Sequence, residues 1–116
     1  MCGIVGYISN HSDSEHNLDK MIDKLNHRGP DNNGKYIDKT NGVYLGHTRL
    51  SIIDLSDTGS QPMISKHENV LIFNGEIYNH LSLKDKLNKE FQISWKGHSD
   101  TEVLLNCIEY FGIDKT

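Results

Sequence analysis

Cys2 is the residue with the clearest potential for covalent chemistry. It follows the initiator methionine, and loss of Met1, which is common before a small residue, would leave a cysteine with a free α-amino group. Free thiols have a pKa of about 8.5, whereas an α-amino group with a pKa of about 7.7–8.0 can accept a proton near neutrality. Such a residue would combine nucleophile and base. Position two alone also fits an incidental cysteine, and this alternative is the stronger one without further observations.

Arg49 is a candidate for binding a carboxylate. The chain has twelve basic residues, of which only Arg28 and Arg49 are arginines. A guanidinium group offers a rigid fork of donors that matches a carboxylate, which the ammonium group of lysine does not. Apolar residues flank Arg49, and it ends a predicted strand. These features favour a binding role over the alternative, a surface salt bridge.

Two further segments have adequate structural explanations. Asn74-Gly75 follows an apolar run, and this pair is typical of a type I′ hairpin turn. Asp100 follows Ser99, a predicted helix cap, and acidic residues in a first helical turn are stabilised by the helix dipole. Taken alone, neither segment requires a function.

Three helices are expected to position these residues. Leu18, Met21, Ile22 and Leu25 have the spacing of one helical face, with Ser12 and Glu15 as a capping box and a break at 27–30. Asn79 is expected to cap a second helix carrying Leu83 and Leu87. Ser99 and Glu102 predict a second capping box, for a helix that ends at Gly112. Its expected apolar face is Val103, Leu104, Cys107, Ile108 and Phe111.

Strands are expected around and between the helices. Residues 3–8 predict a buried strand with Cys2 at its mouth, and 35–38 and 43–48 predict a hairpin that turns at Asn41-Gly42. Residues 70–73 predict another strand, and Phe91, Ile93 and Trp95 alternate as a strand does. Hairpins followed by helices indicate an α+β fold.

Composition limits the class of protein. The 116 residues fit one domain, covering 1–116, and a net charge of −4 argues against a nucleic-acid binder. No apolar run reaches the ~18 residues of a membrane span, and the N-terminus has no basic segment followed by an apolar region, so a cytoplasmic location without a membrane partner is expected. Cys2 and Cys107 are expected to be free thiols, with Cys107 in the core, and the seven histidines lack the spacing of a metal site.

Five segments in register carry a family resemblance. They are Met1-Cys2-Gly3-Ile4-Val5-Gly6, His27-Arg28-Gly29-Pro30-Asp31, Gly46-His47-Thr48-Arg49-Leu50-Ser51-Ile52, Phe73-Asn74-Gly75-Glu76-Ile77-Tyr78-Asn79-His80 and Ser99-Asp100-Thr101-Glu102. Together they resemble the glutaminase domain of class II glutamine amidotransferases, closest to glutamine-hydrolysing asparagine synthetases. The resemblance implies an N-terminal-nucleophile fold, in which two antiparallel sheets stack between helices. The chain is expected to be the N-terminal portion of that domain, incomplete at its C-terminal end and marginally stable alone.

The resemblance assigns roles to individual residues. Cys2 would be the nucleophile, with the Asn74 side-chain amide and the Gly75 backbone N–H as the oxyanion hole. Arg49 would bind the α-carboxylate of glutamine and Asp100 its ammonium group. His27 and Arg28 receive only a role in supporting their loop. The remaining residues of the implied glutamine pocket are Leu50, Ser51, Ile52, Ile53 and Glu76.

The implied reaction is hydrolysis of glutamine to glutamate and ammonia, which a synthetase domain or subunit would use for ATP-dependent amidation of aspartate. ATP and magnesium are expected only in that synthetase domain, which these residues do not contain, and no cofactor or metal is expected in this chain. Two alternatives stay open: an amidotransferase for another carboxylate, such as a sugar acid in surface-polysaccharide synthesis, and a silent module that binds glutamine. Partners are thus L-glutamine, a synthetase and, as a further candidate, a second copy of the chain.

Overall fold

The structure is a computed structural model that describes residues 2–50 and 57–116. These residues form two compact units. The first contains the described residues up to 50 together with Ser60–Pro62 and Ile72–Asn74, and the second contains 57–59, Met63–Leu71 and Gly75–Thr116. Each unit has its own apolar core, so each is described separately.

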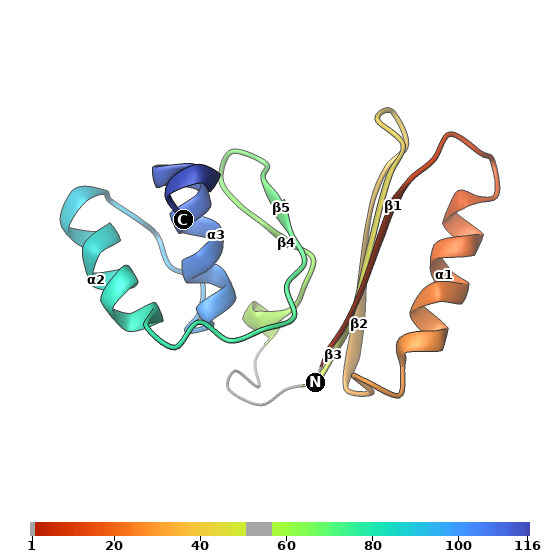
Figure 1. The fold of residues 1–116 in the computed structure, drawn as a ribbon, viewed down its shortest axis with the longest axis horizontal. Coiled ribbons are helices and arrows are strands. Elements are labelled where there is room, and N and C mark those ends of the chain that lie inside the picture. The colour runs from red at the N-terminus through yellow and green to blue at the C-terminus, as the bar shows by residue number, and fades with distance from the viewer. Residues whose placement is uncertain (1, 51–56) are drawn as a thin grey trace. The chain divides into compact units, whose positions relative to one another are not determined.

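The first unit is an antiparallel sheet with one helix. Its strands are β1 (Gly3–Ile8), β2 (Asn32–Asp38) and β3 (Val43–Arg49), in the order β1-β3-β2. Helix α1 (Ser14–Leu25) packs along one face of this sheet (Figure 1). The core between them comprises Leu18, Ile22 and Tyr44, with Val5, Tyr7 and Ile37 packed against it.

The second unit contains two helices and a short hairpin. Strands β4 (Met63–Ile64) and β5 (Val70–Leu71) pair antiparallel, and α2 (His80–Glu90) and α3 (Asp100–Phe111) lie side by side (Figure 1). Two short 3₁₀ helices complete it, Asp57–Gly59 and Ile113–Lys115. Its core comprises Leu87, Val103 and Cys107, surrounded by Leu83, Phe91, Ile93, Trp95, Tyr110 and Phe111.

The α+β class and several elements are confirmed. The predicted strand 3–8 coincides with β1, and the predicted hairpin corresponds to β2 and β3. The predicted burial of this strand is wrong in part: Ile4 is 44% and Ile8 is 79% exposed, because α1 packs on one face of the sheet. Gly42 has a φ of +68° in the connecting turn, a conformation in which glycine avoids the steric cost of a Cβ. Cys107 is buried in the α3 core, as expected. The stacking of two sheets implied by the resemblance stays a prediction.

The predicted capping box of α1 is wrong. The N-cap is Asp13, which makes no side-chain cap hydrogen bond, and Ser12 instead donates its Oγ–H to Asp13. The Glu15 carboxylate does not bond to the helix N-terminus as a capping box requires; it forms an ion pair with Lys39 at 3.1 Å. On the predicted apolar face, Met21 is 43% exposed, so Leu18 and Ile22 make the buried contact.

The predicted strand at Phe91, Ile93 and Trp95 is also wrong, because this segment follows α2 as irregular chain. Its alternation instead places apolar side chains against the helix pair: the Phe91 ring lies 4.6 Å from that of Tyr110. The predicted strand 70–73 is shorter, ending at Leu71. The type I′ turn at Asn74-Gly75 is excluded, since no strand follows β5 there and Gly75 lacks a positive φ.

The sequence correctly predicts which residues are the N-caps of α2 and α3. It predicts their side-chain hydrogen bonds only in part. Asn79 is the N-cap of α2 without a side-chain hydrogen bond. Ser99 caps α3 by accepting from the Glu102 N–H at 3.2 Å. The Glu102 carboxylate does not complete the box; it accepts from the backbone N–H groups of Lys96 and Gly97 at 2.7 and 2.9 Å. The apolar face of α3 includes the buried Leu105, which the predicted face omits.

Candidate functional site

Cys2 lies at the mouth of β1, half-buried, with its sulfur against the end of β3. The Leu50 N–H donates to the Cys2 Sγ at 3.4 Å, and the Leu50 carbonyl lies 3.7 Å from the same sulfur. The β1–β3 register places Gly3 opposite Thr48, which brings these two ends together. The thiol is therefore held by main-chain groups and is not a loose terminal side chain.

Two other residues fix the backbone around Cys2. The Arg28 Nε–H donates to the Cys2 carbonyl at 3.2 Å. Thr48, which is fully buried, accepts from the Gly3 N–H at 3.1 Å and donates to the Leu25 carbonyl at 3.2 Å. A Cβ on Gly3 would lie 2.6 Å from the Thr48 Oγ1, so glycine is required for this approach.

The segment after α1 packs against the end of β3. A Cβ on Gly29 would lie 2.4 Å from the Thr48 backbone, and Pro30 forms a bridge with Arg49. The Asp31 N–H donates to the Arg49 carbonyl at 3.0 Å. Through these contacts, the segment His27-Arg28-Gly29-Pro30-Asp31 packs against the end of β3 that lies beside Cys2.

Arg49 ends β3, as predicted, and is only 7% exposed. Its Nη1–H donates to the Ser60 Oγ at 3.4 Å. This burial excludes the alternative of a surface salt bridge. The antiparallel register, continued one residue from Gly3 opposite Thr48, brings Arg49 opposite Cys2, and Leu50, the residue after β3, contacts the Cys2 sulfur.

Asn74 belongs to the first unit, at the end of the segment Ile72–Asn74. Its side chain is exposed, whereas the preceding Phe73 is half-buried and donates its N–H to the Gln61 Oε1 at 2.6 Å. Gly75, the other predicted oxyanion donor, begins the second unit and is exposed, as is Glu76. The boundary between the units thus runs between the two predicted donors.

Asp100 lies in the first turn of α3 and is 8% exposed. One carboxylate oxygen accepts from the Ile77 N–H at 2.8 Å, which ties α3 to the segment that follows Gly75 and Glu76. An ionised carboxylate has about four acceptor positions, so this bond is compatible with the predicted contact to an ammonium group.

The structure brings Cys2, Arg49 and Leu50 together in the first unit, and connects Asp100 to the Gly75–Ile77 segment in the second. Ser51, Ile52 and Ile53 lie outside the described residues. Sequence reasoning missed Thr48 and undervalued Arg28 and Gly29. The motif around Arg28 was visible, but a motif does not reveal that a guanidinium reaches a carbonyl 26 positions earlier.

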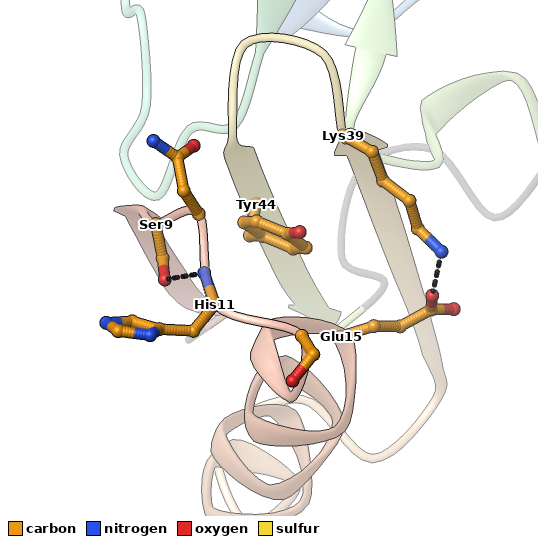
Figure 2. A pocket seen from close by; sticks show the side chains of 7 residues that line it. Ser9, His11, Glu15, Lys39 and Tyr44 are labelled. Atoms are coloured by element: carbon orange, nitrogen blue, oxygen red, sulfur yellow. Dashed lines mark hydrogen bonds and ion pairs between the residues drawn. The ribbon is translucent and has the colours of Figure 1, made fainter.

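A separate hollow of about 330 Å³ lies at the other end of β1, lined by Ser9, Asn10, His11, Ser12, Glu15, Lys39 and Tyr44. Figure 2 shows the ion pair of Lys39 with Glu15 and the bond from the His11 N–H to Ser9. The length of β1, about 20 Å for six residues, separates this hollow from Cys2. It is not part of the candidate site. No described helix has the length and apolarity to cross a membrane.

The structure is that of an α+β domain with a cysteine at the mouth of its first strand, and comparison with known sequences defines the family. A family model described as a glutamine amidotransferase domain matches residues 1–116. The chain belongs to this glutamine amidotransferase domain family.

Several curated proteins are similar over nearly the whole chain. A putative glutamine-hydrolysing asparagine synthetase 2 of Methanocaldococcus jannaschii is 36% identical over 98% of this chain and 25% of its own length. Glutamine-hydrolysing asparagine synthetase 1 of Bacillus subtilis is 38% identical over 96% of this chain and 18% of its own length. A Gibberella zeae protein named amidase chry2 is 35% identical over 97% of this chain and 18% of its own length. The chain thus spans a quarter or less of these relatives.

Proposed function

We propose that this chain hydrolyses glutamine through Cys2 and supplies the ammonia to a synthetase. The observation that carries the proposal is the position of the Cys2 sulfur, 3.4 Å from the Leu50 N–H and at the strand end that carries the buried Arg49. This geometry supports the proposal, because a thiol at this strand end can serve as the nucleophile while the Arg49 guanidinium is of a type suited to the carboxylate of an amino-acid substrate.

The reaction requires Cys2 to be the first residue, with its α-amino group taking the thiol proton. The thiolate attacks the side-chain carbonyl carbon of glutamine, a C–S bond forms, and the carbonyl electrons move to the oxygen. Asn74 and Gly75 donate to this oxyanion. When the intermediate collapses, the C–N bond breaks and the leaving nitrogen takes the proton from the α-ammonium group. Water then cleaves the thioester, releasing glutamate and the thiol.

Substrate binding is assigned to the residues that the family resemblance gives. Arg49 pairs with the α-carboxylate, and burial of the guanidinium strengthens this pairing because water competes less for it. Asp100 pairs with the α-ammonium group while its bond to the Ile77 N–H fixes the carboxylate. The family resemblance assigns the rest of the glutamine pocket to Leu50, Ser51, Ile52, Ile53 and Glu76, of which 51–53 lie outside the described residues.

The acceptor in this proposal is an activated aspartate, because relatives from an archaeon and a bacterium are named as glutamine-hydrolysing asparagine synthetases. ATP and magnesium belong to that synthetase step. The similar protein named an amidase favours a second candidate, in which the same glutaminase serves a different carboxylate. An amidation assay distinguishes the two candidate acceptors. Purified full-length protein is given ATP, ammonia and either aspartate or a sugar acid, and the amide that forms identifies the acceptor.

Cysteine replacement tests the glutaminase itself. In the full-length protein, Cys2→Ala is expected to abolish glutamate release from glutamine while amidation with free ammonia continues. Cys107→Ala is the matched control, because Cys107 is the other cysteine and lies in the core of α3. Unchanged glutamine hydrolysis in Cys2→Ala would reject the assignment. Calorimetric binding of glutamine by the unmodified protein without glutamate release would favour the silent module instead.

A further inference from the structure

The peptide group that joins Cys2 to Gly3 is held on both sides by side chains. Its carbonyl accepts from the Arg28 Nε–H at 3.2 Å. Its N–H donates to the Thr48 Oγ1 at 3.1 Å. A trans peptide group is planar and directs its C=O and N–H to opposite sides, so the two bonds together fix the plane. That plane includes the Cα atom of Cys2, which carries the thiol side chain.

One carbonyl at the end of α1 connects the two side chains. The Leu25 carbonyl accepts from the Arg28 N–H at 2.9 Å and from the Thr48 Oγ1–H at 3.2 Å. Leu25 is the last residue of α1, and the last carbonyls of a helix have no partner within the helix, so this oxygen can serve both donors. The four hydrogen bonds form a closed ring from the helix end to the Cys2–Gly3 peptide group and back.

Packing keeps this ring rigid and shields it from water. Thr48 is fully buried and Arg28 is half-buried, and hydrogen bonds are stronger where water is excluded. A Cβ on Gly3 would lie 3.1 Å from the Leu25 Cβ, so the end of α1 lies directly against the Gly3 backbone. The peptide group is therefore fixed to the helix as well as to β3.

We propose that Arg28 and Thr48 are positioning residues that hold the Cys2 nucleophile for attack on glutamine. The inference rests on the proposed glutaminase function. After removal of Met1 no peptide group precedes Cys2, so the peptide group that follows it is the main-chain link that fixes its Cα atom. Rotations about the Cα–C and Cα–Cβ bonds then separate the held plane from the sulfur, and the Leu50 N–H contact at 3.4 Å restrains both.

The expected effect of losing either bond is on the chemical step. A displacement of about 1 Å in a catalytic group can cost on the order of 100-fold in rate. Glutamine affinity is expected to change little, because the proposed function assigns the carboxylate and ammonium group of the substrate to Arg49 and Asp100.

Kinetics of variants in the full-length protein test the inference. Thr48→Val removes the hydroxyl with little change in shape, and Arg28→Met removes the donor and keeps an unbranched side chain. Each is expected to lower kcat for glutamine hydrolysis by about 10–100-fold, with KM within about twofold. Thr48→Ser keeps the hydroxyl and is expected to recover most of kcat. Thr40→Val and Lys24→Met, at exposed positions of the first unit, are the matched controls with unchanged kinetics.

Two thiol reagents separate positioning from general damage. A glutamine-mimicking diazo-ketone reacts with the Cys2 sulfur from within the substrate site, whereas iodoacetamide reacts with any accessible thiol without a fixed orientation. Thr48→Val is expected to slow the diazo-ketone by about the same factor as kcat, and to change the iodoacetamide rate by no more than about twofold. In an Arg28→Met background, Thr48→Val is expected to cost much less than in wild type, because both residues act through one peptide group.

The outcomes are distinct. Unchanged kcat in both Thr48→Val and Arg28→Met would overturn the inference, and so would a raised KM with kcat unchanged. Equal slowing of both reagents by Thr48→Val would also overturn it, because the thiol would have lost reactivity and not position. If Cys2→Ala retains glutamine hydrolysis, the proposed function itself fails. If Cys2→Ala is inactive while Thr48→Val and Arg28→Met match wild type, the inference alone fails.

Discussion

Lowering the pH from 7.5 to 4.5 is expected to destabilise the first unit through His47. The pKa of His47 is lowered from 6.5 to about 4, because burial disfavours the charged ring and the Arg49 guanidinium repels it, while the Phe73 backbone opposes both effects. The unfolded chain therefore binds a proton near pH 6.5 that the folded chain does not bind until about pH 4. This contribution to stability is complete above pH 6.5 and is lost as the pH falls toward 4.

The size of the loss follows from the two pKa values. Proton linkage gives about 1.4 kcal/mol at pH 5.5 and about 2.5 kcal/mol at pH 4.5, relative to neutral pH. Other groups titrate in the same experiment. Asp38 and Glu15 have lowered pKa values, from hydrogen bonds with Asn41 and Lys39 respectively, so they add a loss at lower pH.

Native-state hydrogen exchange of β3, compared between wild type and His47→Gln, isolates the histidine. The glutamine does not titrate, and the difference between the two proteins cancels the carboxylate contributions and the intrinsic pH dependence of exchange. The opening free energy of wild type should fall relative to His47→Gln by about 2.5 kcal/mol between pH 7.5 and 4.5. Parallel pH profiles for the two proteins would refute the reasoning about His47.

Three further predictions concern single contacts. Ser99→Ala should lower the free energy of unfolding by about 1 kcal/mol through loss of the α3 cap, measured by urea unfolding with Trp95 fluorescence; Ser82→Ala on the exposed face of α2 is the control, and an equal effect of both would contradict the cap. Gly29→Ala should cost roughly 1–3 kcal/mol, because its Cβ would lie 2.4 Å from the Thr48 backbone, and an unchanged melting temperature would count against that packing. Arg49→Lys should raise KM for glutamine by about tenfold or more through loss of the fork, whereas an unchanged KM would remove Arg49 from the substrate site.

Elements with strong local signals could be predicted from the sequence. The apolar run of β1 and the Asn41-Gly42 turn depend on neighbouring residues, and both are confirmed. The segment from Phe91 to Trp95 shows the limit of alternation. Alternation places side chains on one face but does not supply a neighbouring strand, and here the aromatic rings pack against helices instead.

Long-range contacts account for what could not be predicted at the site. Glu15 is spaced correctly for a capping box, yet Lys39 of the β2–β3 connection binds it. The position of Cys2 at the strand end that carries Arg49 could be anticipated from the motifs. The bonds from Arg28 to Cys2 and from Gln61 to Phe73 join residues distant in sequence, and local patterns contain no information about them.

Mass spectrometry of the full-length protein after treatment with a glutamine-mimicking diazo-ketone tests the central claim most directly. The account predicts a mature chain that begins at Cys2, with one label on its sulfur, protection by excess glutamine and no label on the buried Cys107. Retention of Met1 together with an unlabelled Cys2 would contradict it.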